Sequence, residues 1–95
     1  MITCYIIYSK LLDKYYVGIT QLGIESRLVK HNSSYYDKTF SAITSDWAVY
    51  LLIPCDTVSQ SIRLEKHIKK MKSRVYIENL LRYPEMIEKL LQKIN

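Results

Sequence analysis

Tyr5-Ile6-Ile7-Tyr8-Ser9 and Tyr15-Tyr16-Val17-Gly18-Ile19-Thr20 are two runs rich in tyrosine, isoleucine and valine, separated by Lys10-Leu11-Leu12-Asp13-Lys14. Aromatic and β-branched residues favour strands, so the two runs predict a β-hairpin at the N-terminus. Side chains alternate along a strand, and a loop with an even number of residues therefore places Tyr5 and Tyr16 on the same side. The two phenol groups would then share one pocket.

The composition predicts one ordered domain over residues 1–95, because 48% of the residues are hydrophobic and there are only two glycines and two prolines. No run approaches the roughly 18 apolar residues of a membrane span, and the N-terminus has no secretory pattern. Cys4 and Cys55 are far apart, which is more typical of a reducing cytosol than of a disulfide framework or a zinc site. We therefore expect a cytoplasmic protein without membrane association.

Positive charge is concentrated in the segment from Arg63 to Arg74. Six basic residues and one acidic residue give it a net charge of +5, which equals the net charge of the whole chain. Such a confined excess is expected of a surface that binds a polyanion, and a solvated helix face is the alternative. The basic residues are Arg63, Lys66, Lys69, Lys70, Lys72 and Arg74, and the acidic one is Glu65.

A short helix is predicted from Leu22 to about Asn32. At about 100° per residue, Ile24 and Leu28 form its apolar edge, and Arg27 and His31 lie together beside that edge. The pair could contact a phosphate group, or it could be an ordinary surface arginine and histidine.

The middle of the chain predicts a loop followed by a third strand. Residues 33–40 are polar and aromatic without a period, and Lys38 and Thr39 either hold a backbone phosphate or pack the loop down. Trp47 to Ile53 is a continuous apolar run closed by Pro54, which is typical of a central strand covered on both faces.

A longer helix is predicted from Asp56 or Thr57 to about Lys72. Glu65 falls near the middle of its apolar arc, where a carboxylate needs a cation such as a metal ion or Arg27, unless it forms a salt bridge within the core. Two further helices, over about 75–81 and from Pro84, follow a core-packing pattern. The arc opposite Glu65 holds Arg63, Lys66, His67 and Lys70.

The order of these elements resembles the GIY-YIG nuclease superfamily over nearly all 95 residues. Thr3-Cys4-Tyr5, then ten residues, then Tyr16-Val17-Gly18 is similar to its paired motif, although Thr3 replaces a glycine. Small stand-alone bacterial members, related to the N-terminal domain of the excision-repair nuclease, are also similar at Lys38-Thr39, Asp46-Trp47 and Lys72-Ser73-Arg74. The resemblance implies an α/β (α+β) fold with a three-stranded antiparallel sheet, an N-terminal hairpin and flanking helices.

The resemblance also implies which residues act. It gives catalytic roles to Tyr5, Tyr16, Arg27, His31 and Glu65, with Glu65 as the ligand of Mg²⁺ or Mn²⁺ and Gly18 as a structural glycine. Tyr5 would be the base or base relay, assisted by His31, because a tyrosine with a pKa of about 10 is a poor base alone. Tyr16 would orient water or phosphate, and Arg27 would hold the phosphate oxygens. Nucleic acid would be contacted by Lys38, Thr39, Arg63, Lys66, Lys69, Lys70, Lys72 and Arg74.

The implied function is a metal-dependent endonuclease that hydrolyses phosphodiester bonds of nucleic acid, with DNA favoured over RNA as the substrate. Nothing marks a base-reading helix, so we expect structure-directed or single-strand cleavage in DNA repair or processing. Two alternatives remain open at this stage: a catalytically silent nucleic-acid-binding module of the same fold, and a small interaction protein whose basic helix contacts an acidic partner.

Overall fold

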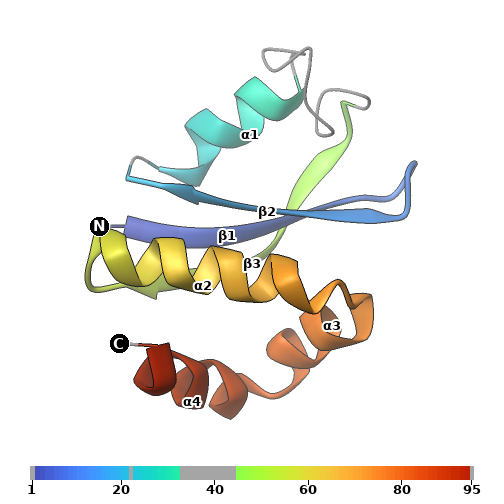
Figure 1. The fold of residues 1–95 in the computed structure, drawn as a ribbon. Coiled ribbons are helices and arrows are strands. Elements are labelled where there is room, and N and C mark those ends of the chain that lie inside the picture. Colours follow the sequence, from blue (N-terminus) through green and yellow to red (C-terminus); the bar gives the residue numbers. More distant parts are fainter. Residues whose placement is uncertain (1, 22, 33–44, 95) are drawn as a thin grey trace.

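The computed structural model describes residues 2–21, 23–32 and 45–94, which form one three-stranded antiparallel sheet and four helices (Figure 1). The helix α1 lies on one side of the sheet, and α2, α3 and α4 lie on the other. This arrangement confirms the predicted α+β fold. The strands, in the spatial order β2-β1-β3, are β1 (Ile2–Ser9), β2 (Lys14–Thr20) and β3 (Trp47–Cys55). The helices are α1 (Ile24–Asn32), α2 (Val58–Met71), α3 (Arg74–Arg82) and α4 (Pro84–Ile94).

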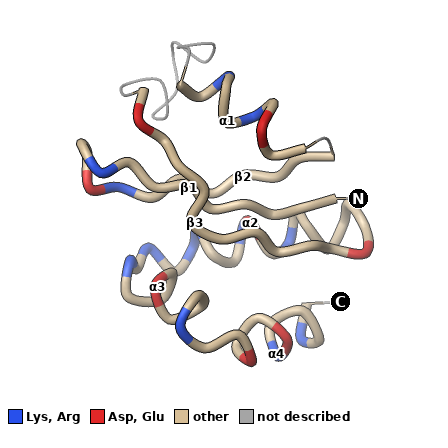
Figure 2. The backbone as a smooth tube through the Cα atoms, turned by 180° about the vertical axis from the view of Figure 1, so that it is seen from behind, with Lys and Arg blue, Asp and Glu red and all other residues tan. Residues whose placement is uncertain are grey.

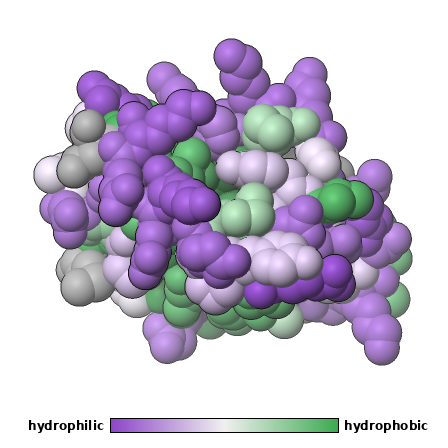
Figure 3. All heavy atoms as spheres, turned by 90° about the horizontal axis from the view of Figure 1, so that it is seen from below, coloured by the Kyte–Doolittle hydropathy of each residue, from purple (hydrophilic) through white to green (hydrophobic). Residues whose placement is uncertain are grey.

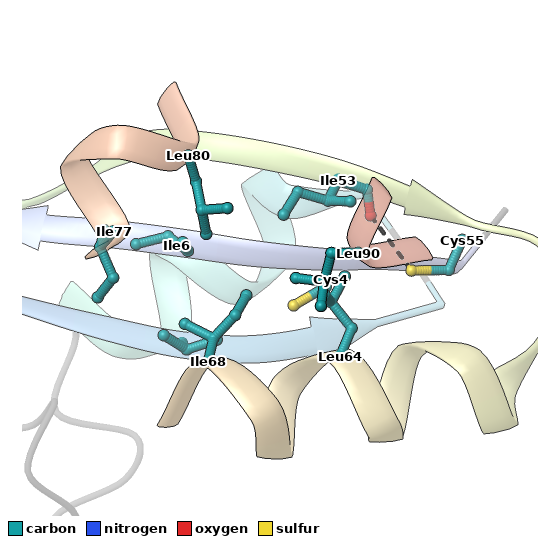
Figure 4. Packing of buried hydrophobic residues seen from close by; sticks show 10 residues of the cluster. Cys4, Ile6, Ile53, Cys55, Leu64, Ile68, Ile77, Leu80 and Leu90 are labelled. Atoms are coloured by element: carbon teal, nitrogen blue, oxygen red, sulfur yellow. Dashed lines mark hydrogen bonds between the residues drawn. The ribbon is translucent and has the colours of Figure 1, made fainter. Parts of the chain in front are cut away.

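The central strand is β1, and it is apolar at successive positions because both of its faces are covered. Cys4 and Ile6 belong to the core cluster beneath the sheet, whereas Tyr5 and Ile7 belong to the cluster beneath α1. None of the four is more than 3% exposed. The larger cluster joins β1 to β3 and to the three helices on its side, and it includes Ile53, Leu64, Ile68, Ile77, Leu80 and Leu90 (Figure 4).

The hairpin has the register that its tyrosines require. Tyr5 pairs with Gly18 and Ile7 pairs with Tyr16, so Tyr5 and Tyr16 lie on the same face of the sheet, as predicted. Four residues, Lys10 to Asp13, separate the two strands.

The hairpin turn is tied to the start of α3 by a fork of hydrogen bonds. Arg74 donates to both carboxylate oxygens of Asp13, at 2.7 and 3.0 Å, and the Tyr8 hydroxyl donates to the same carboxylate at 2.5 Å. The turn and the start of α3 accordingly lie on one side of the molecule (Figure 2). The Arg74 guanidinium is the largest cause that lowers the pKa of Asp13, to about 2, so this carboxylate stays ionised over the working range of most enzymes.

The prediction of β3 as a central strand is wrong. It lies at the edge of the sheet, where Val49 and Leu52 are 43% and 42% exposed. An edge strand also tolerates Pro54, which lies inside β3 instead of ending it.

A β-bulge explains why β3 nevertheless has a continuous apolar run. Ile6 pairs with Leu51 but Ile7 pairs with Val49, so Tyr50 is an extra residue in β3. The extra residue reverses the alternation of side chains. Trp47 therefore packs beneath α1 with Tyr5, whereas Ile53 packs in the larger cluster on the opposite face.

Side-chain caps fix the starts of α2 and α3. The hydroxyl of Thr57, one of the two predicted caps of α2, accepts a hydrogen bond from the Gln60 amide at 3.0 Å. Helix α2 ends at Lys72 in the left-handed conformation, with φ of 47°, and Ser73 then caps α3.

Helices α3 and α4 complete the layer below the sheet. Polar side chains predominate on their outer face, with apolar ones between them (Figure 3). Pro84 is the first residue of α4, as predicted. In the described part of the chain, no helix combines the length and apolar character needed to cross a membrane.

Candidate active site

A buried tyrosine–histidine pair lies between β1 and α1. The Tyr5 hydroxyl is 2.9 Å from Nε2 of His31, and the two side chains are 3% and 2% exposed. Ile24 and Leu28 pack α1 onto the same cluster as Tyr5. This packing fixes the helix in the rotation that turns His31 inward, at the position where its imidazole meets the phenol.

Gly18 provides the space in which the Tyr5 ring lies. The two residues are direct cross-strand partners, and a Cβ atom added at Gly18 would be 2.5 Å from the Tyr5 hydroxyl oxygen and 2.6 Å from Cζ. The predicted structural role of this glycine therefore has a steric cause. A side chain at this position would occupy the place of the hydroxyl end of Tyr5.

We expect Gly18→Ala to destabilise the fold by about 1–3 kcal/mol, because the methyl group must displace the Tyr5 ring from its buried site. Urea denaturation measures the change in the free energy of unfolding. The matched control is Gly23→Ala, whose added Cβ would approach only the flexible end of the exposed Glu25 side chain, at 2.7 Å from Oε2. Equal stability of the two variants would contradict the steric role of Gly18.

Tyr16 connects the buried pair to the edge of the sheet. Its ring centroid lies 4.8 Å from that of His31, and Nζ of Lys69 lies 5.6 Å from the Tyr16 centroid. The same ammonium group is 3.5 Å from a carboxylate oxygen of Glu65. A continuous series of contacts thus runs from Tyr5 through His31, Tyr16 and Lys69 to Glu65, around the outer edge of β2.

Glu65 lies beside the apolar face of α2 and not in its middle. Its side chain is 22% exposed, and it forms an ion pair with Lys69, one helical turn further on, and not with the predicted Arg27. The predicted apolar arc is displaced because α2 packs against β1, β2 and α4 together. The buried residues of α2 are Gln60, Ser61, Leu64 and Ile68, whereas Val58, Ile62 and Met71 of the same helix are exposed.

Arg27 reaches the same edge of the sheet from α1. With Thr20 of β2 and Ser61 of α2 it lines a hollow of about 210 Å³, and Glu65 follows Ser61 by one helical turn. The structure therefore brings side chains of α1 and α2 to one hollow at the open edge of β2. A guanidinium in this position can offer two parallel hydrogen bonds to phosphate oxygens.

His31 is held in its neutral form. Burial of the imidazole, and secondarily the positive charge of Arg27, lower the pKa of His31 below its usual value. The group is therefore uncharged near neutral pH, and its hydrogen-bonded Nε2 can accept a proton in the tautomer that carries its proton on Nδ1.

The lowered pKa predicts that the fold loses stability in mild acid. As the pH falls below about 6.5, the unfolded chain takes up a proton at His31 more readily than the folded chain does. The free energy of unfolding should then fall more steeply between pH 7.5 and 5.5 in the wild-type protein than in His31→Gln. Thermal unfolding across this range measures the difference, and parallel pH profiles of the two proteins would contradict it.

The predicted nucleic-acid-binding residues fall into separate groups. Lys69 and Lys72 lie on the side of the active site, whereas Lys66 and Lys70 are exposed on the outer part of α2. Lys38 and Thr39 lie outside the described residues. Two predicted phosphate contacts are engaged within the protein: Arg63 donates to the carbonyl oxygen of Ile94 at 3.2 Å, and Arg74 forms the fork with Asp13.

One carboxylate at the site has the oxygen ligands that a hard divalent cation prefers. Within the described ranges no group of three His, Cys, Asp or Glu residues could enclose a metal ion, and Glu65 is the single carboxylate that the contact series brings to the site. Mg²⁺ is commonly held by one or two carboxylates and keeps water and phosphate oxygens as its other ligands. Glu65 could provide such a site, provided that Lys69 gives up its ion pair.

Sequence reasoning missed two residues that hold the site together. Asn32 accepts a hydrogen bond from the Trp47 amide at 2.7 Å and donates to the Trp47 carbonyl at 3.0 Å, which joins the end of α1 to the start of β3. Asp46 accepts from the Ser9 hydroxyl at 2.5 Å and from the Leu11 amide at 2.9 Å. The only sequence signals were the position of Asn32 directly after His31 and the similarity at Asp46-Trp47.

The fold is a small α+β domain built on an antiparallel sheet, with a series of polar and ionisable side chains around the edge strand β2. The family model of the GIY-YIG catalytic domain matches residues 1–79, and the chain belongs to this family. Membership supports a nuclease-type function and implies a nucleic-acid substrate. The match includes every residue of the contact series, and α4 lies beyond it. Comparisons with curated proteins and with solved structures found no match.

Proposed function

We propose that the protein is a metal-dependent endonuclease that hydrolyses phosphodiester bonds of DNA, and that it acts in DNA repair or processing in the cytoplasm. The observation that carries the proposal is the hydrogen-bonded Tyr5–His31 pair, which the contacts of Tyr16 and Lys69 connect to Glu65. A pair that can accept a proton, next to a lone carboxylate, is suited to the activation of water beside a bound cation.

Charge stabilisation would come from both sides of β2. Glu65 would hold Mg²⁺ or Mn²⁺, which when bound supplies Lewis-acid stabilisation of the charge on the phosphate and on the leaving oxygen. Arg27 would bind the non-bridging oxygens with its planar guanidinium, because charge develops there during the displacement. Lys69 would be released from Glu65 when the cation binds and could then contact the phosphate.

The Tyr5–His31 pair would remove the proton from the attacking water as a relay. As the Tyr5 oxygen accepts the proton of the water, its own hydroxyl proton moves to Nε2 of His31, and the imidazole becomes charged. This route requires the tautomer of His31 with its proton on Nδ1, and a neutral His31 is favoured by its lowered pKa. A tyrosinate need not accumulate, so the high pKa of an ordinary tyrosine is no obstacle.

Tyr16 would orient the water or the phosphate. It is half-buried, whereas Tyr5 is almost fully buried, so its side chain is the more accessible of the two. Its ring also contacts His31 and Lys69, and a shift of Tyr16 would therefore disturb both ends of the series.

One substrate panel tests the proposal. Labelled single-stranded, duplex, flap and branched DNA, and RNA of the same sequences, are incubated with Mg²⁺, with Mn²⁺ or with EDTA. We expect cleavage of DNA that depends on the metal ion and is strongest on single-stranded or branched forms. Binding without cleavage under every condition would indicate a catalytically silent nucleic-acid-binding module, and neither binding nor cleavage would favour an interaction protein.

A further inference from the structure

A second and larger hollow lies beside Tyr16, between the hairpin and the junction of α2 with α3. Its volume is about 430 Å³, within the range of pockets that bind small ligands. Its walls include Lys14 and Tyr16 from β2, and Lys69, Lys72 and Arg74 from the helical side. We call it the Lys14–Lys72 hollow.

The hollow carries a net positive charge, because four basic residues and one acidic residue line it. Arg74 is paired with Asp13, which also lines the hollow, and Lys69 is paired with Glu65. Lys14 and Lys72 have no ion pair with any residue that the structure describes. Two ammonium groups on opposite walls of one hollow form a site for an anion.

The backbone at Lys72 supports a role for its side chain. The residue ends α2 in the left-handed conformation, with φ of 47°, where glycine or asparagine is usual because a Cβ atom is strained there. A glycine would end the helix at least as well. A lysine at this position therefore adds a cation to the wall despite a less favourable backbone.

The position of the hollow relates it to the reaction. Residues 14–17 of β2 line the Lys14–Lys72 hollow, and residues 19 and 20 line the smaller hollow that contains Arg27. Between the two lies Gly18, beneath the Tyr5 ring. A nucleic-acid strand that follows the open edge of β2 would place the scissile phosphate near Tyr16 and a neighbouring nucleotide in the larger hollow.

We propose that the Lys14–Lys72 hollow binds the nucleotide adjacent to the scissile phosphate and holds it by its own phosphate group. The proposal rests on the proposed nuclease function and adds a subsite to it. A hollow of about 430 Å³ is large enough for one nucleotide.

Binding of a short oligonucleotide in the absence of metal tests the hollow separately from catalysis. The probe is the trinucleotide dT3, titrated by calorimetry in EDTA at low salt. We expect the double variant Lys14→Ala/Lys72→Ala to bind dT3 at least about tenfold more weakly, because two charge-assisted contacts are lost. The matched control is Lys10→Ala/Lys89→Ala, which removes the same charge from an exposed hairpin position and from α4 and should change the affinity less than about twofold.

Equal weakening in the two double variants would show that only the net charge matters, and this result would overturn the proposal. Circular dichroism and thermal unfolding establish that both variants are folded. If the wild-type protein cleaves DNA but the Lys14/Lys72 variant binds dT3 and cleaves like the wild type, only the proposal about the hollow fails. If dT3 binding depends on Lys14 and Lys72 but no nucleic acid is cleaved, the nuclease function fails and the hollow remains a nucleotide site.

Discussion

Glu65→Gln is expected to reduce metal-dependent cleavage of DNA by roughly 10³-fold, because it removes the only carboxylate that the contact series brings to the cation. Glutamine keeps the size of the side chain and can still accept a hydrogen bond, so the fold should be retained. The lost ion pair with Lys69 contributes at most about 1 kcal/mol, since partly exposed pairs of this kind are weak. Initial cleavage rates with Mg²⁺ measure the effect, and Glu65→Ala should behave in the same way.

A titration of Mn²⁺ by electron paramagnetic resonance separates metal binding from chemistry. The wild-type protein should bind Mn²⁺ more tightly than Glu65→Gln does. Glu88→Gln is the matched control, because Glu88 is exposed on α4 and its loss changes the net charge by the same amount. If Glu65→Gln binds Mn²⁺ and cleaves DNA like Glu88→Gln, Glu65 does not hold the cation.

Tyr5→Phe is expected to lower the cleavage rate by about 10²- to 10⁴-fold, which is the usual contribution of a positioned acid or base. The ring remains over Gly18, and only the hydroxyl group bonded to His31 is lost, at a cost of about 1 kcal/mol in the free energy of unfolding. Tyr83→Phe is the control, because Tyr83 is 43% exposed and lies after α3, outside the contact series.

The pH dependence of the rate gives a second measure of the relay. The relay needs neutral His31, so the wild-type rate should rise as the pH increases through the lowered pKa of His31 and should then level off. The small residual rate of Tyr5→Phe should lack this rise with pH. A larger loss in Tyr16→Phe than in Tyr5→Phe would assign the proton transfer to Tyr16 and leave the buried pair with a structural role.

The features of the fold that depend on neighbouring residues were predictable from the sequence. The hairpin register followed from the alternation of side chains, and the cap at Thr57 and the helix start at Pro84 followed from local residue preferences. The inward edge of α1, with Ile24 and Leu28, followed from the helical period. These features hold because the same residues are favourable in the isolated element and in the complete fold.

The features of the fold and of the site that were not predicted depend mostly on contacts between residues far apart in the sequence. A bulge leaves no mark in the composition of β3, so its apolar run predicts a strand that is covered on both faces. The cation beside Glu65 is its own helical neighbour Lys69, whereas Arg27 is placed by the rotation of a different helix. Lys14 lies outside the basic segment and lines the same hollow as Lys72 only because the hairpin returns to the end of α2.

The extra residue Tyr50 divides β3 into two halves in which the side chains alternate in opposite phase. Before it, odd-numbered side chains point to the layer of α1, and after it, odd-numbered side chains point to the opposite layer. Loss of one residue between Trp47 and Leu51 would give β3 one continuous alternation of side chains, and Trp47 would then lie on the face opposite Tyr5. The spacing of these five residues is thus as exacting a requirement as their identity, and variants that change chain length at this point should be tolerated far less than substitutions.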